Sequence, residues 1–373
     1  MRFLFRVTAT AAGLLVAVIG AAGPASAGPT RVDPALTLAT CAPGAPCAHP
    51  LPVRVVIVSM FEVGADTGDA PGEFQPWRER RHLDVRLPFP NAWHDLYYNP
   101  DSQILGMVTG VGSIKAGSAV TALGLDPRFD LRHAYWLVAG IAGIDPEDAS
   151  IGSAAWARYI VDGDLAHEID AREIPKDWAF GRFPLDSQGE QDALVHHERG
   201  ELYTLNPGLE RWAFALTKDI KLPDHPDIAA SRARYVGYPN AQRPPFVLEG
   251  DQLSAITFWH GKLLNDWANH WVRLWTRGKG EFVTAAEEDS GTALAIDYLD
   301  RIGKVDKDRL LLLRAGSNYT MPPPGVTAAD NLRHENQGYS GMTASIESLY
   351  IVGSKVVDEL LAHWDRYGTA VPR

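Results

Sequence analysis

Apolar runs that end in glycine or polar residues alternate along this chain with stretches of helical periodicity. The run 53–60 is β-branched almost throughout, which is typical of a central strand buried on both faces. Further strands are predicted at 104–107, 134–140, 151–161, 246–253 and 310–313, and one begins at 282. Helices are predicted at 206–220, 226–235, 261–275 and 345–364; one more ends near 123, and another begins after 291. This alternation predicts one α/β domain over residues 52–373, with a mainly parallel or mixed sheet flanked by helices.

The turn 108–117 follows one of these predicted strands and holds two glycines one residue apart, Gly110 and Gly112. A strand, a glycine turn and a small-residue helix together bring backbone N–H groups close to a ligand. The turn is not a dinucleotide loop, which needs glycine where Lys115 stands, nor a P-loop, which needs Gly-Lys-Ser/Thr. It predicts a binding site whose ligand has to be inferred from the rest of the chain.

Polar residues also follow other predicted strands. They are Glu62, the pair Gly250-Asp251, the run Glu287-Glu288-Asp289, and the segment from Arg314 to Asn318. Because ligands bind at the carboxyl ends of strands in α/β folds, we expect these segments to meet Thr109 and Gly110 at one rim. Glu62 is a candidate general base, with a solvent-facing loop carboxylate as the alternative. The three consecutive acids either turn inward toward ligand hydroxyls or stay solvated at a helix N-terminus.

Residues 1–27 have the layout of a cleavable secretory signal, with two arginines, an apolar middle and the ending Ala25-Ser26-Ala27. We expect cleavage after Ala27 and export to a periplasm or the exterior; the alternative is a retained anchoring helix. The Pro/Ala-rich segment 28–51 carries the only cysteines, Cys41 and Cys47. In an oxidising compartment their proximity favours a local disulfide, with two free thiols as the alternative.

The chain is acidic, with a formal charge of −11. Loss of residues 1–27 removes two arginines and no acidic residue, so the charge becomes −13. This balance argues against nucleic acid or anionic lipid as a partner, and the chain after the signal has no apolar run long enough for a pore. His167 beside several acids is a weak metal signal, so we expect no metal or cofactor. An aromatic stripe on 261–275 fits core or a subunit interface, which leaves a homo-oligomer open.

Five segments, taken in order, resemble motifs of the nucleoside phosphorylase and nucleosidase superfamily over residues 53–320. Thr109 to Ala116 looks like its small-Gly-Ile-Gly-Lys-Val segment, and 139–143 with 151–152 looks like its Gly-x-Ala-Gly strand exit and the continuation. Gly250-Asp251-Gln252 resembles its Ser-Gly-Asp strand end, 287–289 its Glu-Met-Glu, and 314–318 its Arg-x-x-Ser-Asp. The resemblance implies the nucleoside phosphorylase-like fold.

More narrowly, Pro71 to Gln75, Gly250 to Gln252 with Thr257 to Gly261, and Glu288 to Thr292 are similar to the purine nucleoside permeases. This similarity extends over nearly the whole chain after residue 27. The family name implies transport, yet no spanning segment follows the signal. The resemblance therefore implies an exported protein that binds a purine nucleoside in a phosphorylase-like site.

Cleavage of an N-glycosidic bond builds positive charge on the ribose and negative charge on the departing base. By resemblance, Glu288 or Asp289 would accept hydrogen bonds from the ribose hydroxyls, beside Glu287, and Arg314 would hold that carboxylate. Ser317 would support a base-contacting Asn318.

The remaining candidates surround these groups in the same resemblance. Thr109 and Gly110 would line the ribose side, and Gly250, Asp251 and Leu253 would offer backbone to the edge of the base. Glu62 would activate water.

Two positions depart from the pattern. Asn318 stands where nucleosidases have aspartic acid, and an amide donates a hydrogen bond but delivers no proton. The Gly-Asp-Pro-x-Arg phosphate loop of the superfamily is missing after the first strand, where Phe61 and Glu62 stand, so water is favoured over phosphate as the nucleophile. We expect a nucleosidase. The competing hypothesis is a binding protein without turnover that delivers nucleoside to a separate membrane transporter.

Overall fold

The computed structural model describes residues 32–41, 47–189 and 200–373. The predicted signal 1–27, together with residues 28–31 and 42–46 of the segment that follows it, lies outside these residues. Within the described ranges, no helix has both the length and the apolar character that a membrane crossing requires.

A mixed sheet of twelve strands forms the centre of the fold, and its main path runs β12-β9-β14-β15-β7-β2-β5-β4-β3, with β16, β8 and β13 branching from β7. Strands β2, β5, β7 and β16 are parallel, whereas β15 runs antiparallel to β7. The strands are β1 Leu51–Pro52, β2 Val55–Ser59, β3 Val85–Leu87, β4 Leu96–Asn99, β5 Ile104–Val108, β6 Phe129–Asp130, β7 Tyr135–Ile144, β8 Ala154–Ala157, β9 Tyr159–Asp162, β10 His167–Glu168, β11 Arg182–Phe183, β12 Leu202–Thr204, β13 Val247–Glu249, β14 Asp251–Ser254, β15 Phe282–Ala286 and β16 Leu310–Tyr319.

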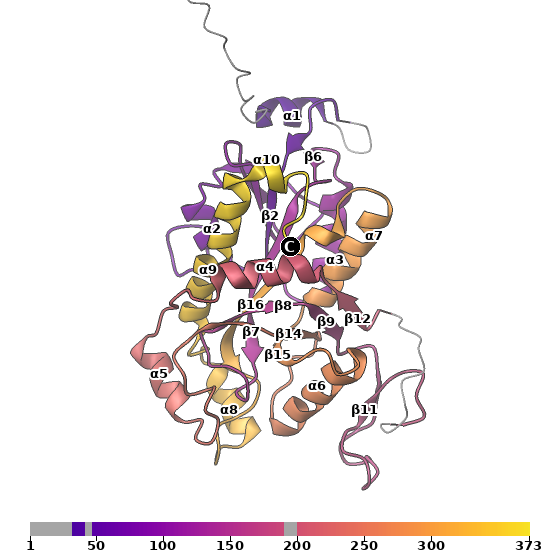
Figure 1. The fold of residues 1–373 in the computed structure, drawn as a ribbon, viewed down its shortest axis with the longest axis vertical. Helices are drawn as coiled ribbons and strands as arrows, with labels where there is room; N and C mark the ends of the chain where they lie inside the picture. Colours follow the sequence, from indigo (N-terminus) through magenta and orange to yellow (C-terminus); the bar gives the residue numbers. More distant parts are fainter. Residues whose placement is uncertain (1–31, 42–46, 190–199) are drawn as a thin grey trace, which may run out of the picture. The chain divides into compact units, whose positions relative to one another are not determined.

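Helices cover both faces of this sheet (Figure 1). They are α1 Pro34–Thr40, α2 Gln75–Arg80, α3 Ser113–Leu125, α4 Pro207–Thr217, α5 Pro226–Ala233, α6 Lys262–Trp275, α7 Asp289–Arg301, α8 Ala328–Glu335, α9 Met342–Ala362 and α10 Trp364–Tyr367, with a 3-10 turn at Lys307–Arg309.

The central strand β2 shows why both faces need a cover. Successive side chains of a strand point to opposite faces, so Val56 and Val58 pack in the core with α3 and α7, while Val55 and Ile57 pack in the core with α2, α4 and α9. All four valine and isoleucine side chains are fully buried. The predicted α/β fold with a mixed sheet between helices is confirmed.

Four of the predicted strands differ in extent from the observed strands. β7 continues through the glycines to Ile144, and β16 continues through Arg314 to Tyr319, so segments expected as exits lie within strands. Their long parallel pairing explains this extension. The segment 246–253 is divided at Gly250 into β13 and β14, and 151–161 is divided at Arg158 into β8 and β9.

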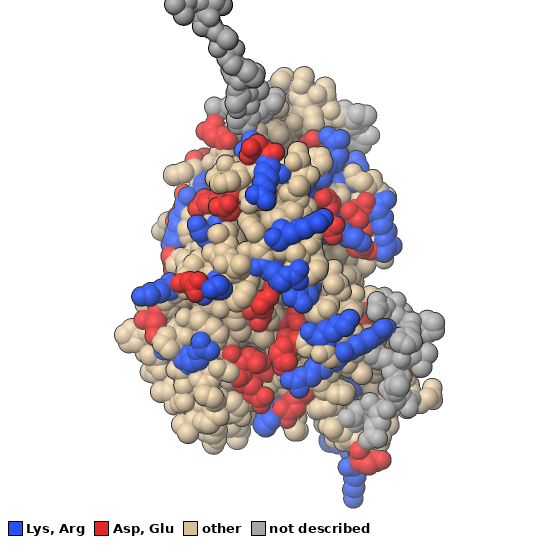
Figure 2. Space-filling model, viewed as in Figure 1, with Lys and Arg blue, Asp and Glu red and all other residues tan. Residues whose placement is uncertain are grey.

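Two interactions within the N-terminal segment fold it on itself, and one strand pairing attaches it to the domain. A disulfide joins Cys41 to Cys47, the Thr37 hydroxyl donates to the carbonyl of His49 at 2.6 Å, and β1 pairs with β6. On the face shown in Figure 2, the acidic and basic side chains of the described residues are interspersed and form no continuous basic stripe.

Candidate active site

A cavity of about 250 Å³ opens where several strands end. Its floor and walls are formed by residues from β7, β16 and the segments that follow β2, β14 and β15. The residues lining it are Met60, Phe61, Glu73, Val111, Ile141, Ala142, Gly143, Ala255, Thr257, Phe258, Trp259, Ala285, Ala286, Glu287, Glu288, Arg314, Ser317, Asn318, Thr320, Tyr339 and Met342. This set brings Glu287, Glu288, Arg314, Ser317 and Asn318 together at one rim, as the strand-end pattern predicted.

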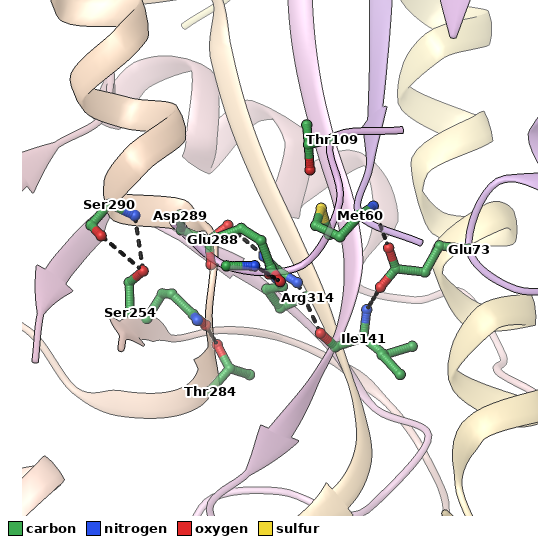
Figure 3. Close-up of polar contacts among 12 residues, drawn as sticks. Met60, Glu73, Thr109, Ile141, Ser254, Thr284, Glu288, Asp289, Ser290 and Arg314 are labelled. Atoms are coloured by element: carbon green, nitrogen blue, oxygen red, sulfur yellow. Dashed lines mark hydrogen bonds and ion pairs between the residues drawn. The ribbon is translucent and has the colours of Figure 1, made fainter. Parts of the chain in front are cut away.

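Arg314 is the central polar group of this cavity (Figure 3). Its Nε and Nη2 donate to the two carboxylate oxygens of Asp289 at 3.1 and 2.6 Å, and Nη2 also donates to Glu288 at 2.9 Å. Its Nη1 donates to the carbonyl of Ile141 at 2.9 Å. Arg314, Glu288 and Asp289 are each at most 2% exposed. Because each guanidinium nitrogen has a protein acceptor, Arg314 orients the two carboxylates.

The glycine-rich turn reaches the site through Gly112 and Val111. The N–H of Gly112 donates to Glu288 at 3.2 Å, and Val111 lines the cavity. Helices α3 and α7 come very close at this point, because a Cβ on Gly291 would lie 2.0 Å from the carbonyl oxygen of Ser113. The glycine at 291 therefore permits the approach that puts Gly112 beside Glu288.

Thr109 and Gly110 are not among the residues that line the cavity, and their role on the ribose side stays a prediction. The Thr109 hydroxyl donates to the carbonyl of Gly110 at 3.0 Å, and Thr109 lies beside the arginine cluster without contacting it (Figure 3). Gly110 has a φ of 83° and packs against Lys115 and Trp93. These residues shape the turn, and the residues after them reach the site.

Glu73 brings a further carboxyl group into the cavity, and it was absent from the predicted site. Its two oxygens accept from the backbone N–H groups of Met60 and Ile141, both at 2.7 Å, and the side chain is 3% exposed. Glu73 is held between the end of β2 and β7, on the Arg314 side of the cavity (Figure 3). The sequence signal was the Pro71 to Gln75 segment, which resembled the permeases but had been given no role.

Glu62 stabilises the loop that follows it and is not among the residues that line the cavity, and its role as the candidate base stays a prediction. Its carboxylate accepts from the N–H groups of Val63, Gly72, Phe74 and Gln75. These bonds fold residues 62–72 back on themselves. The returning segment brings Glu73, just before the start of α2, to the cavity. A carboxylate with this many backbone donors has its lone pairs engaged.

Burial and mutual repulsion control the ionisation of the cavity carboxyls. Burial raises the pKa of Glu73 to about 8, and the Glu288 carboxyl adds to this rise against the opposing effect of Arg314. Burial and the neighbouring Glu288 raise the pKa of Glu287 to about 7, and burial raises the pKa of Glu288. Burial lowers the pKa of Arg314, but Asp289 and Glu288 outweigh that effect and raise it. Burial and mutual repulsion therefore disfavour the ionised forms of Glu73 and Glu287, and Arg314 opposes this effect.

Ser317 and Asn318 face the same cavity although they are neighbours in one strand. Alternation would send them to opposite faces, but the pairing of β16 with β7 shifts register between Gly316 and Asn318. Such a bulge re-aims side chains. The Ser317 hydroxyl donates to Oδ1 of Asn318 at 2.9 Å, and Nδ2 of Asn318 donates to the carbonyl of Tyr319 at 3.4 Å, which leaves its second N–H for another acceptor.

The predicted residues Gly250, Asp251 and Leu253 are not among those that line the cavity, and their contact with the base stays a prediction. Asp251 begins β14 and accepts from the N–H groups of Arg158, Tyr159 and Glu281. A Cβ on Gly250 would lie 2.3 Å from Val283, so glycine is needed there for strand packing. Leu253 is buried in the apolar core against α6. The residue of this segment that reaches the cavity is Ala255, beyond the end of β14.

Aromatic side chains also line the cavity. Phe258 and Tyr339 are stacked, with ring centroids 6.3 Å apart and an interplanar angle of 5°. Trp259 lines the cavity next to Phe258. Among the described residues, no group of three or more His, Cys, Asp or Glu side chains is arranged to hold a metal ion.

The family model of the purine nucleoside permeases matches residues 52–372. The chain belongs to the purine nucleoside permease family. A Schizosaccharomyces pombe protein described as a probable purine nucleoside permease is 31% identical over 83% of this chain and 90% of its own length. A Candida albicans purine nucleoside permease is 28% identical over 84% of this chain and 76% of its own length.

Solved structures show where this permease-family chain stands among folds. A 5'-methylthioadenosine/S-adenosylhomocysteine nucleosidase from Helicobacter pylori has a TM-score of 0.50 at 14% identity, with 83% of this chain and 99% of that chain covered. A futalosine hydrolase from Helicobacter pylori gives a TM-score of 0.50 at 14% identity, with 83% and 98% covered. At this identity the similarity shows the nucleosidase-like fold alone.

Proposed function

We propose that this chain binds purine nucleosides in the cavity and hydrolyses the N-glycosidic bond. The observation that carries the proposal is the presence in one cavity of three separately held polar groups. These are Glu73 on two backbone N–H groups, Glu288 on Arg314, and Asn318 on Ser317. The names of the permease relatives and of the nucleosidase neighbours support a nucleoside as the ligand.

Each group has a role in the proposed reaction. Glu288 accepts hydrogen bonds from the ribose hydroxyls, and Arg314 keeps that carboxylate oriented. Asn318 donates from Nδ2 to N7 of the purine, which stabilises the negative charge that develops on the base. Glu73 accepts a proton from the water that attacks C1' of the ribose, so it has to be ionised to act.

Water is the proposed nucleophile because the cavity offers no free cation for phosphate among its described lining residues. Arg314 is the only lysine or arginine that lines it, and its nitrogens already bind Asp289, Glu288 and Ile141. Phosphate would face Glu73, Glu287 and Glu288 with no cation to pair with. The same charges disfavour nucleotides relative to nucleosides.

Free base is the product that tests this function. The purified protein is incubated with inosine, adenosine and uridine, with and without phosphate, and free base is measured. Equal release of purine in both buffers is expected. Release that needs phosphate would replace hydrolysis with phosphorolysis. Tight calorimetric binding without release would support instead a nucleoside-binding protein that serves uptake, the function that the amide of Asn318 favours.

Export of the protein remains part of the proposal and is tested by N-terminal sequencing of the mature chain.

A further inference from the structure

The cavity has more acidic side chains than the binding of a neutral nucleoside requires. Glu73, Glu287 and Glu288 all line it, Asp289 lies directly behind, and Arg314 is the only basic side chain among the lining residues that the structure describes. If all five groups were ionised, the cluster would carry three negative charges more than positive. Burying like charges is unfavourable unless a ligand or protons compensate them.

The aromatic lining of the cavity is suited to a flat cation. Phe258 and Tyr339 present parallel rings, and Trp259 follows Phe258 in the chain. The faces of aromatic rings attract cations, most strongly where the site is partly desolvated. Carboxyls and aromatic rings that line one cavity together favour a positively charged ring.

Asn318 adds a chemical argument. A neutral purine leaves most easily when it is protonated, and the amide of Asn318 cannot supply a proton. A base that carries a fixed positive charge needs none, because it leaves with the bonding electron pair as a neutral molecule.

From these three observations, and resting on the proposed function, we propose that the cavity accepts and hydrolyses nucleosides whose base is a fixed cation, of the N-ribosylpyridinium class. The C1'–N bond breaks and its electron pair moves to the ring nitrogen, which becomes neutral. The oxygen of water bonds to C1', and its proton passes to Glu73 and then to solvent. Each turnover thus consumes one cation and one water and yields ribose, a neutral pyridine and one proton.

Binding tests the charge preference separately from turnover. Dissociation constants are measured for nicotinamide riboside and for its dihydro form, which has a similar shape but no charge. We expect the cation to bind at least about 10-fold more tightly, a difference within the range of buried cation–aromatic and charge contacts. The ratio of the two constants should fall in Glu287→Gln and Phe258→Leu, and should stay the same in Glu347→Gln, a carboxylate paired with Arg80 on the surface. Equal binding of the two forms by the unmodified protein would overturn the proposal.

Turnover is then followed in weak buffer with a pH indicator. One proton per released nicotinamide is expected from nicotinamide riboside, and none from inosine. Cleavage of inosine with no cleavage of nicotinamide riboside would also overturn the proposal while leaving the proposed function intact. Failure to cleave inosine would instead refute the proposed purine hydrolysis. The ratio of the two dissociation constants would still test whether the cavity prefers a cation.

Discussion

Arg314 and Asp289 form a two-point ion pair in the wall of the cavity, with Nη2 to Oδ1 at 2.6 Å and Nε to Oδ2 at 3.1 Å. Both side chains are 1% exposed. The pair joins the long strand β16 to the first turn of α7, and the same guanidinium holds Glu288. The ion pair therefore connects the stability of the domain with the orientation of the carboxylate that we assign to the ribose.

Asp289→Asn should destabilise the protein strongly, because it leaves a buried guanidinium without its main partner. Loss of one member of a buried pair costs about 3–5 kcal/mol, and the change is measured as the free energy of unfolding in urea. Asp358→Asn is the matched control, since Asp358 pairs with Arg81 but is 61% exposed. It should leave the free energy nearly unchanged. A similar loss of unfolding free energy in both variants would mean that the buried pair stabilises the protein no more than the exposed pair does.

The rate of hydrolysis should rise with pH. Glu73 acts as a base only when it is ionised, and burial raises its pKa to about 8. For inosine, kcat/KM should therefore increase through neutral pH and level off above about pH 8, since this quantity reports the free enzyme. A profile that is flat between pH 6 and 9, or that falls, would remove Glu73 as the base.

The same raised pKa values should make the free energy of unfolding fall as the pH rises, whereas the rate of hydrolysis rises. Between the usual carboxyl pKa of 4.5 and the raised values of Glu73 and Glu287, the folded state binds more protons than the unfolded state. The free energy of unfolding contributed by these groups is thus fully present below that usual pKa and is lost as pH rises through about 7 to 8. Urea unfolding at pH 5, 6.5 and 8 should show this decline. Glu73→Gln should make it shallower, and an unchanged slope would contradict the assignment.

The orientation of Asn318 should matter to purines and not to pyrimidines. Ser317→Ala removes the hydroxyl that fixes Oδ1, and a lost hydrogen bond of this kind costs about 0.5–1.5 kcal/mol. We expect weaker binding of inosine and no selective loss for uridine, which lacks N7; calorimetry measures both. Ser348→Ala removes a buried hydroxyl that donates to Gly152 outside the cavity and is the control. An equal loss for both nucleosides would point to general disruption.

Local sequence pattern predicted those site residues that lie close to their own strand ends. The run 287–289 follows β15 directly, and Arg314 lies four residues beyond the start of β16. Both strands pair with β7, β15 antiparallel and β16 parallel, and this shared neighbour brings the two segments together. The α/β alternation predicted the sheet for the same reason. Gly250 and Asp251 lie where the predicted strand is divided in two, and period-two patterns do not show where one strand ends and the next begins.

Glu73 could not be found in this way, because its position depends on a folded loop. It reaches the cavity only because Glu62, eleven positions earlier, accepts hydrogen bonds from the backbone N–H groups of the returning segment. Ser317 and Asn318 share a cavity only because of a register shift against β7. Both features arise from hydrogen bonds between segments distant in sequence, which hydrophobic periodicity does not encode.

The most direct test of the account compares the unmodified protein with Glu73→Gln in phosphate-free buffer. Inosine binding and hypoxanthine release are measured on the same samples, with Glu347→Gln as a surface control. The account predicts that all three proteins bind inosine and that Glu73→Gln releases base about 10²- to 10⁴-fold more slowly, the usual weight of a general base. Release at the unmodified rate by Glu73→Gln, or binding without any release by the unmodified protein, would contradict it.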